Sequence, residues 1–301
     1  VGTDVFAIDT GSNSGIPPGS FDSGFPVDLG ILKQPDNATD WIIGSRLIGG
    51  SHQYTNQDYS GSSGNLVWDS NVGFWKDVNN TYQGWMWKRH AGLDVVTYKG
   101  NSVNGRAIPH SLSKTPEMIW TKNRDQSDNW VVWHNGLTVT PLANAWIPLN
   151  TSSAQDTANN HYGSSTATLP TSTHWTVGNA DPVNEDGEKY ISMLFSSVDG
   201  ISKVGSYSGS SSAVTLDLGF QPRFIIIRRC NTGGTGWFVF DTTRGINTGN
   251  DPYVELDEPT AQVNTQDWVD LTSTGITINQ GMSGGHAIND NGDTYIYYAH
   301  A

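Results

Sequence analysis

The sequence is poor in cysteine and in positive charge. Cys230 is the only cysteine, so no intrachain disulfide can form. Only 15% of the 301 residues are charged. The chain has 16 Lys and Arg and 29 Asp and Glu, which gives a formal net charge of −13. No basic stripe offsets this charge, so neither nucleic acid nor an anionic membrane surface is expected as a partner. The negative field suits neutral sugars, cations or a basic partner.

Long apolar runs and helical periodicity are also missing. The longest apolar stretches, such as residues 224–227, are far below the ~18 residues that span a bilayer, so no membrane insertion is expected. No window shows a sustained 3.6-residue period. The chain begins at Val1, with neither a methionine nor a signal peptide, and we interpret it as a segment of a longer protein.

Glycine, small polar residues and aromatics fill the chain instead. It holds 34 Gly, 12 Trp, 11 Tyr and 9 Phe. Disordered proteins lack aromatics, so this composition excludes intrinsic disorder. β-Branched and aromatic runs are interrupted by Gly, Asn and Ser, which indicates a β-protein.

Internal repeats organise the chain. The segment 289–298 matches 184–193 in the spacing from Asn through Gly to Tyr, and 77–85 is a weaker third copy. Asn and Gly accept positive φ most easily, so all three copies are expected to be turns that lead into strands.

Further landmarks recur in the same order along the chain. In each copy a proline that opens an apolar run lies 14 or 15 residues before a tryptophan; these tryptophans are Trp41, Trp130 and Trp237. The shared order predicts three modules of one kind, of which the first is truncated or atypical and lacks a clear leading strand. The predicted modules span residues 1–92, 93–200 and 201–301.

Each module is expected to be a small antiparallel β-structure. The third module has about eight short strand signals, with turn signals every ~8–12 residues. Such spacing is typical of a sandwich or jelly roll. The sequence therefore predicts an all-β protein of three tandem antiparallel β-sandwich modules of jelly-roll-like type.

Most of the aromatics are expected in the core. On the strand after each turn, one alternating face is large and apolar in all copies, as Trp85, Met193 and Tyr298 illustrate. Aromatics without a repeat counterpart are the candidates for exposed binding residues, with packing as the alternative for each. These candidates are Tyr54, Tyr59, Trp75, Tyr162 and Trp175.

The search for catalytic and metal-binding motifs yields little. Residues 281–285 match G-x-S-x-G, but the sixteen residues that follow predict no helix, so we interpret this match as a glycine-rich loop. The histidines show no metal-binding spacing, and no cofactor is expected, although oxygen-rich turns could bind Ca²⁺. Acidic residues cluster within 181–188, 251–258 and 290–293, where two carboxylates could serve glycoside hydrolysis if they lie ~5–9.5 Å apart. We predict no enzymatic activity and no catalytic residues.

Four segments carry a resemblance to a known family: 82–101, 218–229, 237–245 and 292–299. They resemble a tandem domain of unknown function found in tail-fibre proteins of tailed phages, especially marine and cyanobacterial ones. The resemblance implies a virion tail appendage that is assembled in the host cytoplasm. It also implies a homotrimer, contacts with other virion tail proteins, and adhesion to a host-surface glycan or protein.

The function expected from these observations is that of a non-enzymatic tail-fibre or receptor-binding protein. Its loops would bind a host-surface glycan or an outer-membrane component. Two alternatives remain open: a structural connector of a tail or capsid fibre without a host ligand, and a tailspike-like polysaccharide depolymerase.

Overall fold

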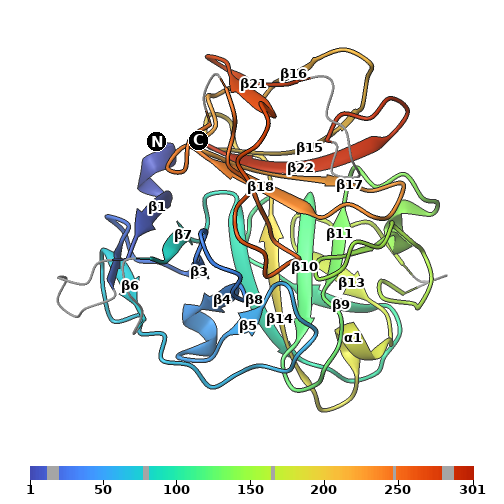
Figure 1. Cartoon of the computed structure of the whole chain (residues 1–301). Coiled ribbons are helices and arrows are strands. Elements are labelled where there is room, and N and C mark those ends of the chain that lie inside the picture. Colours follow the sequence, from blue (N-terminus) through green and yellow to red (C-terminus); the bar gives the residue numbers. More distant parts are fainter. Residues whose placement is uncertain (12–19, 77–80, 164–166, 247–248, 280–287) are drawn as a thin grey trace.

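The computed structural model describes residues 1–11, 20–76, 81–163, 167–246, 249–279 and 288–301. Its helices are all short: η1 (Gly2–Asp4), η2 (Arg46–Ile48), η3 (Leu142–Asn144) and α1 (Asp181–Asn184). Within the described ranges no helix combines the length and the apolar character needed to cross a bilayer. β-Strands make up the rest of the framework (Figure 1).

Each third of the chain forms a five-stranded antiparallel sheet. The first sheet has the order β1 (Phe6–Thr10), β7 (Gln83–Trp87), β3 (Leu29–Lys33), β4 (Ile42–Ser45) and β5 (Gln53–Tyr54). The second has the order β8 (Leu93–Lys99), β14 (Lys189–Phe195), β10 (Met118–Asn123), β11 (Val131–His134) and β12 (Ile147–Pro148). The third has the order β15 (Ser202–Ser208), β22 (Thr294–His300), β17 (Phe224–Arg229), β18 (Trp237–Asp241) and β19 (Val254–Glu255). The strand order is therefore the same in all three.

A smaller antiparallel sheet accompanies each large one. The first is β2 (Ser20–Asp22) with β6 (Gly73–Trp75), and the second is β9 (Arg106–Pro109) with β13 (His174–Val177). The third is β16 (Val214–Asp217) with β21 (Gly275–Ile278) and β20 (Val269–Leu271). The predicted fold class is confirmed: the protein is all-β, with three repeated sheet pairs consistent with three tandem β-sandwich modules.

The first module does have a leading strand, so the prediction that it lacks one is wrong. β1 pairs with β7, with Phe6 opposite Trp87, just as β8 pairs with β14 and β15 with β22. Only five residues form β1, too few for a clear alternating pattern, and pairing with β7 defines the strand. The module limits at residues 92 and 200 remain predictions.

The three large sheets share one hydrophobic core. The inward faces of all three supply buried side chains to it, including Trp85, Met193 and Tyr298, so the predicted core face of these strands is confirmed. The opposite face of each large sheet packs against its own small sheet and forms a separate cluster. Each large sheet is thus covered on both sides, which explains why central strands such as β17 and β22 are buried along almost their whole length.

The recurrent tryptophans link the modules in a closed ring. Each indole Nε1 donates a hydrogen bond to the second residue of the short fifth strand in another module. The three bonds are Trp41 to the Glu255 carbonyl (2.8 Å), Trp130 to Tyr54 (2.8 Å) and Trp237 to Pro148 (3.0 Å). The first module thus contacts the third, the second contacts the first, and the third contacts the second.

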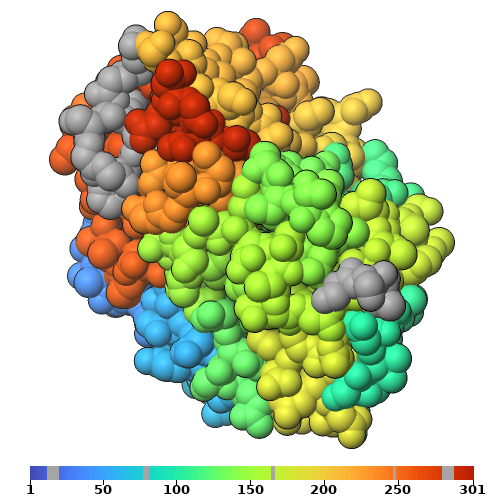
Figure 2. Space-filling model, turned by 90° about the vertical axis from the view of Figure 1, so that its right-hand side faces the viewer, coloured from blue at the N-terminus to red at the C-terminus, as the bar shows by residue number. Residues whose placement is uncertain are grey.

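A second ring of buried cations follows the same order. The third strand in the order of each large sheet carries a completely buried cation at its fifth residue. These cations are Lys33 on β3, Lys122 on β10 and Arg228 on β17. Each donates to main-chain carbonyls of the neighbouring module, at Pro259 (2.9 Å), Asp58 (3.0 Å) and Ser153 (2.7 Å) respectively. These donors satisfy carbonyls that would otherwise lose hydrogen bonds on burial. In Figure 2 the blue, green-to-yellow and orange-to-red segments accordingly meet along one continuous surface.

Candidate functional site

Two of the five candidate aromatics lie in the core. Tyr162 is 3% exposed and Trp175 is 1% exposed, and both belong to the cluster between the large and small sheets of the second module. The expectation that they are exposed is therefore wrong. Trp175 lies on β13, whose pairing with β9 places its ring beneath the small sheet, where it contacts Tyr98.

The other three candidates lie nearer the surface. Tyr59 is 52% exposed, and its ring meets the half-buried Tyr54 edge to face at 6.4 Å. Tyr54 also serves the scaffold, because its carbonyl accepts the Trp130 indole bond. Trp75 is half-buried and lines a hollow of about 500 Å³ with Val72 and Asp69. The structure brings Tyr54 and Tyr59 together, whereas Trp75 lines a separate hollow.

A different pocket lies where the first and second modules meet. It has a volume of about 520 Å³ and is built mainly from segments that connect strands. Asp58 follows β5, Asp128 lies between β10 and β11, and Asp181 begins α1. Trp146 precedes β12, and His161 belongs to the long connection before β13. We call this the Trp146 pocket.

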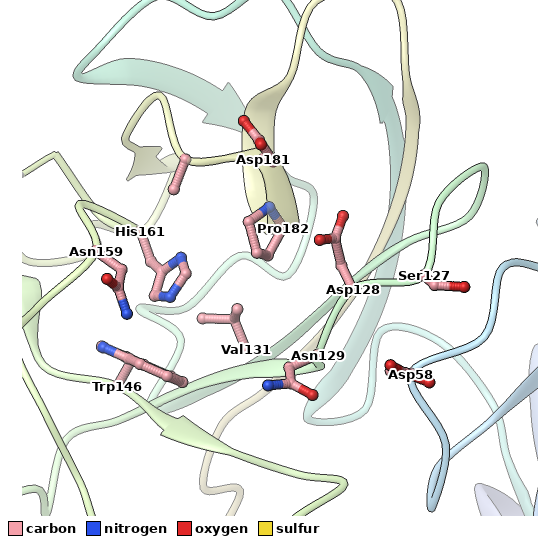
Figure 3. Close-up of a pocket in the computed structure, with 11 residues that line it drawn as sticks. Asp58, Ser127, Asp128, Asn129, Val131, Trp146, Asn159, His161, Asp181 and Pro182 are labelled. Atoms are coloured by element: carbon pink, nitrogen blue, oxygen red, sulfur yellow. The ribbon is translucent and has the colours of Figure 1, made fainter.

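Aromatic rings form one side of the Trp146 pocket. Figure 3 shows Trp146, His161 and Asn159 gathered on one side, with Asp128 across the hollow. The Trp146 and His161 rings meet edge to face at 4.4 Å and 82°. The Trp146 indole donates to the Ala158 carbonyl at 3.0 Å, which fixes the ring while part of it stays exposed.

His161 is buried and incompletely hydrogen-bonded. Its side chain is 3% exposed, and its Nδ1 finds no hydrogen-bond partner among the described residues. Burial lowers the pKa of His161 to about 4, against an opposing effect of the Asp156 charge. The imidazole is therefore neutral near pH 7, and Nδ1 can form one hydrogen bond with a ligand.

Acidic groups line the opposite side. Burial raises the pKa of Asp128; nearby Asp181 and Glu188 add to the rise, and Asn123 and Lys122 oppose it. Asn123 Nδ2 donates to Asp128 Oδ2 at 2.9 Å and holds this carboxylate in place. The carboxylates offer several acceptor lone pairs to a ligand that carries N–H or O–H groups.

Other chemistry finds little support in the described part of the chain. No group of three or more His, Cys, Asp or Glu side chains there is arranged to hold a metal ion. Cys230 is buried, and burial raises the pKa of its thiol to about 12, which makes it unreactive. The G-x-S-x-G match at 281–285 lies outside the described residues.

The sequence did contain a signal for Trp146 and His161. The repeat aligns Trp146 with Tyr253, which also precedes a two-residue strand, and the residue fifteen positions later is His161 in one module and Trp268 in the other. An aromatic position that is shared by two repeats is typical of core residues, so this signal alone predicts burial of Trp146 and no site.

Comparisons with known proteins identify only a family. No curated protein and no solved structure matches the chain. The model of a family described as a domain of unknown function, DUF7483, matches residues 79–301, about three quarters of the sequence. The match supplies no activity and no tail-fibre association. On this evidence, the chain belongs to the DUF7483 family.

Proposed function

We propose that this protein is a non-enzymatic receptor-binding protein of a phage tail. It binds a host-surface glycan or an outer-membrane component through loops on its β-scaffold. The observation that carries the proposal is the Trp146 pocket, in which a half-buried tryptophan faces carboxylates across a hollow built from connecting segments. Its volume lies within the ~300–1,000 Å³ typical of small-molecule sites.

The strands and the connecting segments have different structural roles, which supports binding by the connecting segments. The recurrent tryptophans and the inward strand faces hold the three modules together. Connecting segments contribute to these links through main-chain carbonyls such as those of Asp58, Ser153 and Pro259, and their side chains can vary in chemistry. The net charge of −13 favours uncharged or cationic groups over anionic ones as ligands.

The tail setting and the homotrimer belong to the same proposal and rest on the resemblance to tail-fibre domains. Stability does not depend on disulfides, because Cys230 is the only cysteine and is buried. Such a fold suits assembly in a reducing host cytoplasm. Light scattering of the isolated chain tests the trimer directly: a mass of three chains supports it, and a mass of one chain refutes it.

The binding proposal is tested on host cells. Fluorescently labelled protein should bind susceptible cells and leave receptor-deficient resistant cells unstained; equal binding, or none, to both would refute adhesion. The same protein incubated with extracted host polysaccharide should release no new reducing ends. Release of reducing ends would favour the depolymerase alternative.

A further inference from the structure

The Trp146 pocket has a filled counterpart in the third module. Trp146 bridges to Asp156 as Tyr253 bridges to Val263, ten residues later in both cases. The carbonyl of His161 accepts from the residue just after β13, and that of Trp268 accepts from the residue just after β21. Both ring pairs meet edge to face, at 82° in the second module and 79° in the third. The two sites are therefore equivalent positions of the repeat.

Side-chain size separates the open site from the filled one. Phe238 directly follows Trp237, and its ring lies 5.0 Å from Tyr253 and 5.8 Å from Trp268. Tyr253 and Trp268 are consequently 5% and 1% exposed.

In the second module, Val131 holds the position of Phe238, because it directly follows Trp130. Val131 and His161 replace two larger aromatic side chains and leave space next to Trp146. The opening thus results from two smaller residues within a backbone arrangement that both modules share.

The opened space is polar on one side and incompletely hydrogen-bonded on the other. His161 is more than nine-tenths buried, yet its Nδ1 has no partner within the described ranges. Leaving a buried polar atom unpaired costs ~1–3 kcal/mol in general, so such an atom favours a ligand that can pair with it. The Asp128 and Asp181 carboxylates accept hydrogen bonds only, so the ligand must supply donors.

We propose that the Trp146 pocket binds one uncharged pyranose ring of a glycan, an inference that rests on the proposed adhesion function. The exposed part of Trp146 packs against the apolar C–H surface of the ring. Hydroxyl groups donate to the Asp128 and Asp181 carboxylates, and one hydroxyl pairs with His161 Nδ1.

Charge favours an uncharged sugar over an anionic or a cationic one. The carboxylates repel uronic acids and phosphorylated sugars. The Lys122 ammonium lies near the carboxylates of Asp128 and Asp58 and donates to the carbonyls of Asp58 and Gln126 at 3.0 and 3.3 Å. Burial lowers the pKa of Lys122 to about 8, so it stays protonated near pH 7 and offsets part of the acidic charge that would attract an amine.

The test fills the pocket with the side chains of the third module. Val131→Phe and His161→Trp are prepared in the full chain, with Val103→Phe as a matched control at an exposed valine outside the pocket. Binding of neutral hexose, glucuronic acid and glucosamine oligosaccharides is measured by saturation-transfer NMR and calorimetry. Cooperative thermal unfolding of each variant establishes that it folds.

We expect the wild type and Val103→Phe to bind a neutral oligosaccharide, and both filled variants to lose at least tenfold in affinity. Binding of glucuronic acid or glucosamine alone would overturn the inference, as would unchanged affinity in both folded, filled variants. Cell binding distinguishes a failure of the pocket assignment from a failure of the proposed function. If the filled variants still bind susceptible cells, adhesion is supported and the pocket assignment is refuted. If the wild type binds the neutral sugar at Trp146 but no host cell, the pocket stands and adhesion falls.

Discussion

The second and third modules share a strand order and their links to neighbouring modules, yet they differ sharply beside Trp146 and Tyr253. In the third module, Phe238 and Trp268 close the space next to Tyr253. In the second module, the same backbone positions carry smaller residues and a pocket of about 520 Å³ remains. The repeat therefore determines where a site can exist, and two side-chain volumes determine whether it does.

The first module adds a third case. His52 precedes β5 and bridges to Ser62, ten residues later, so it occupies the position of Trp146 and Tyr253. It is 5% exposed and packs edge to face against Tyr54 at 5.0 Å. Three different rings at one repeat position thus give one open site and two buried ones.

The largest loss of stability is expected from a substitution in the filled site of the third module. Phe238→Ala should lower the free energy of unfolding by about 3–5 kcal/mol, because it removes a fully buried ring and leaves a cavity. Val131→Ala at the open site should cost only about 1.5 kcal/mol, the transfer free energy of two methyl groups. Urea unfolding of both variants measures the difference, and equal losses would show that the two sites are packed alike.

Acidification should affect the open site more than the filled one. Burial lowers the pKa of His161 to about 4, below the ~6.5 of an unfolded histidine. The unfolded chain therefore binds more protons between these values, so stability falls as the pH drops from about 6.5 to 4. His161→Trp removes this titration. Between pH 7.5 and 4.5, the free energy of unfolding of this variant should fall by about 2–3 kcal/mol less than that of the wild type.

Urea unfolding at the two pH values measures this difference in pH dependence. The other buried histidines are present in both proteins and cancel in the comparison. Identical losses in wild type and His161→Trp would mean that His161 does not titrate as an isolated buried group.

The tryptophan hydrogen bonds between modules should contribute equally to stability in the second and third modules. Trp130→Phe and Trp237→Phe each remove an indole donor to a carbonyl of the neighbouring module. Each should cost about 1.5 kcal/mol, since a buried carbonyl loses its partner. A several-fold difference between the two unfolding free energies would contradict the equivalence of these links.

The smallest effect is expected at Tyr59, which is 52% exposed and adjoins Asp58 of the Trp146 pocket. Tyr59→Ala should change the unfolding free energy by less than about 0.5 kcal/mol. Any loss of host-cell binding by this variant would then reflect a direct role in recognition. Unchanged binding would remove Tyr59 from the binding candidates.

The fold could be predicted further than the site. Trp41, Trp130 and Trp237 recur at fixed intervals, so their shared structural role was visible in the sequence, whereas β1 was too short to show a pattern. Tyr162 and Trp175 have no aromatic counterpart, because the aligned residues of the third module are Val269 and Ile276, which are buried in its own cluster. The sequence shows the change of residue type but not the shared burial.

The Trp146 pocket escaped prediction for a different reason. Its opening depends on the volumes of Val131 and His161 relative to Phe238 and Trp268, and on Asp58 from another module. Such a difference appears only when aligned positions are placed in space.

The most direct measurement is a crystal structure of the protein soaked with a neutral oligosaccharide. We predict electron density for one pyranose ring against Trp146, within hydrogen-bonding distance of His161 Nδ1, and none beside Tyr253. Density at another surface, with the Trp146 pocket empty, would contradict the account.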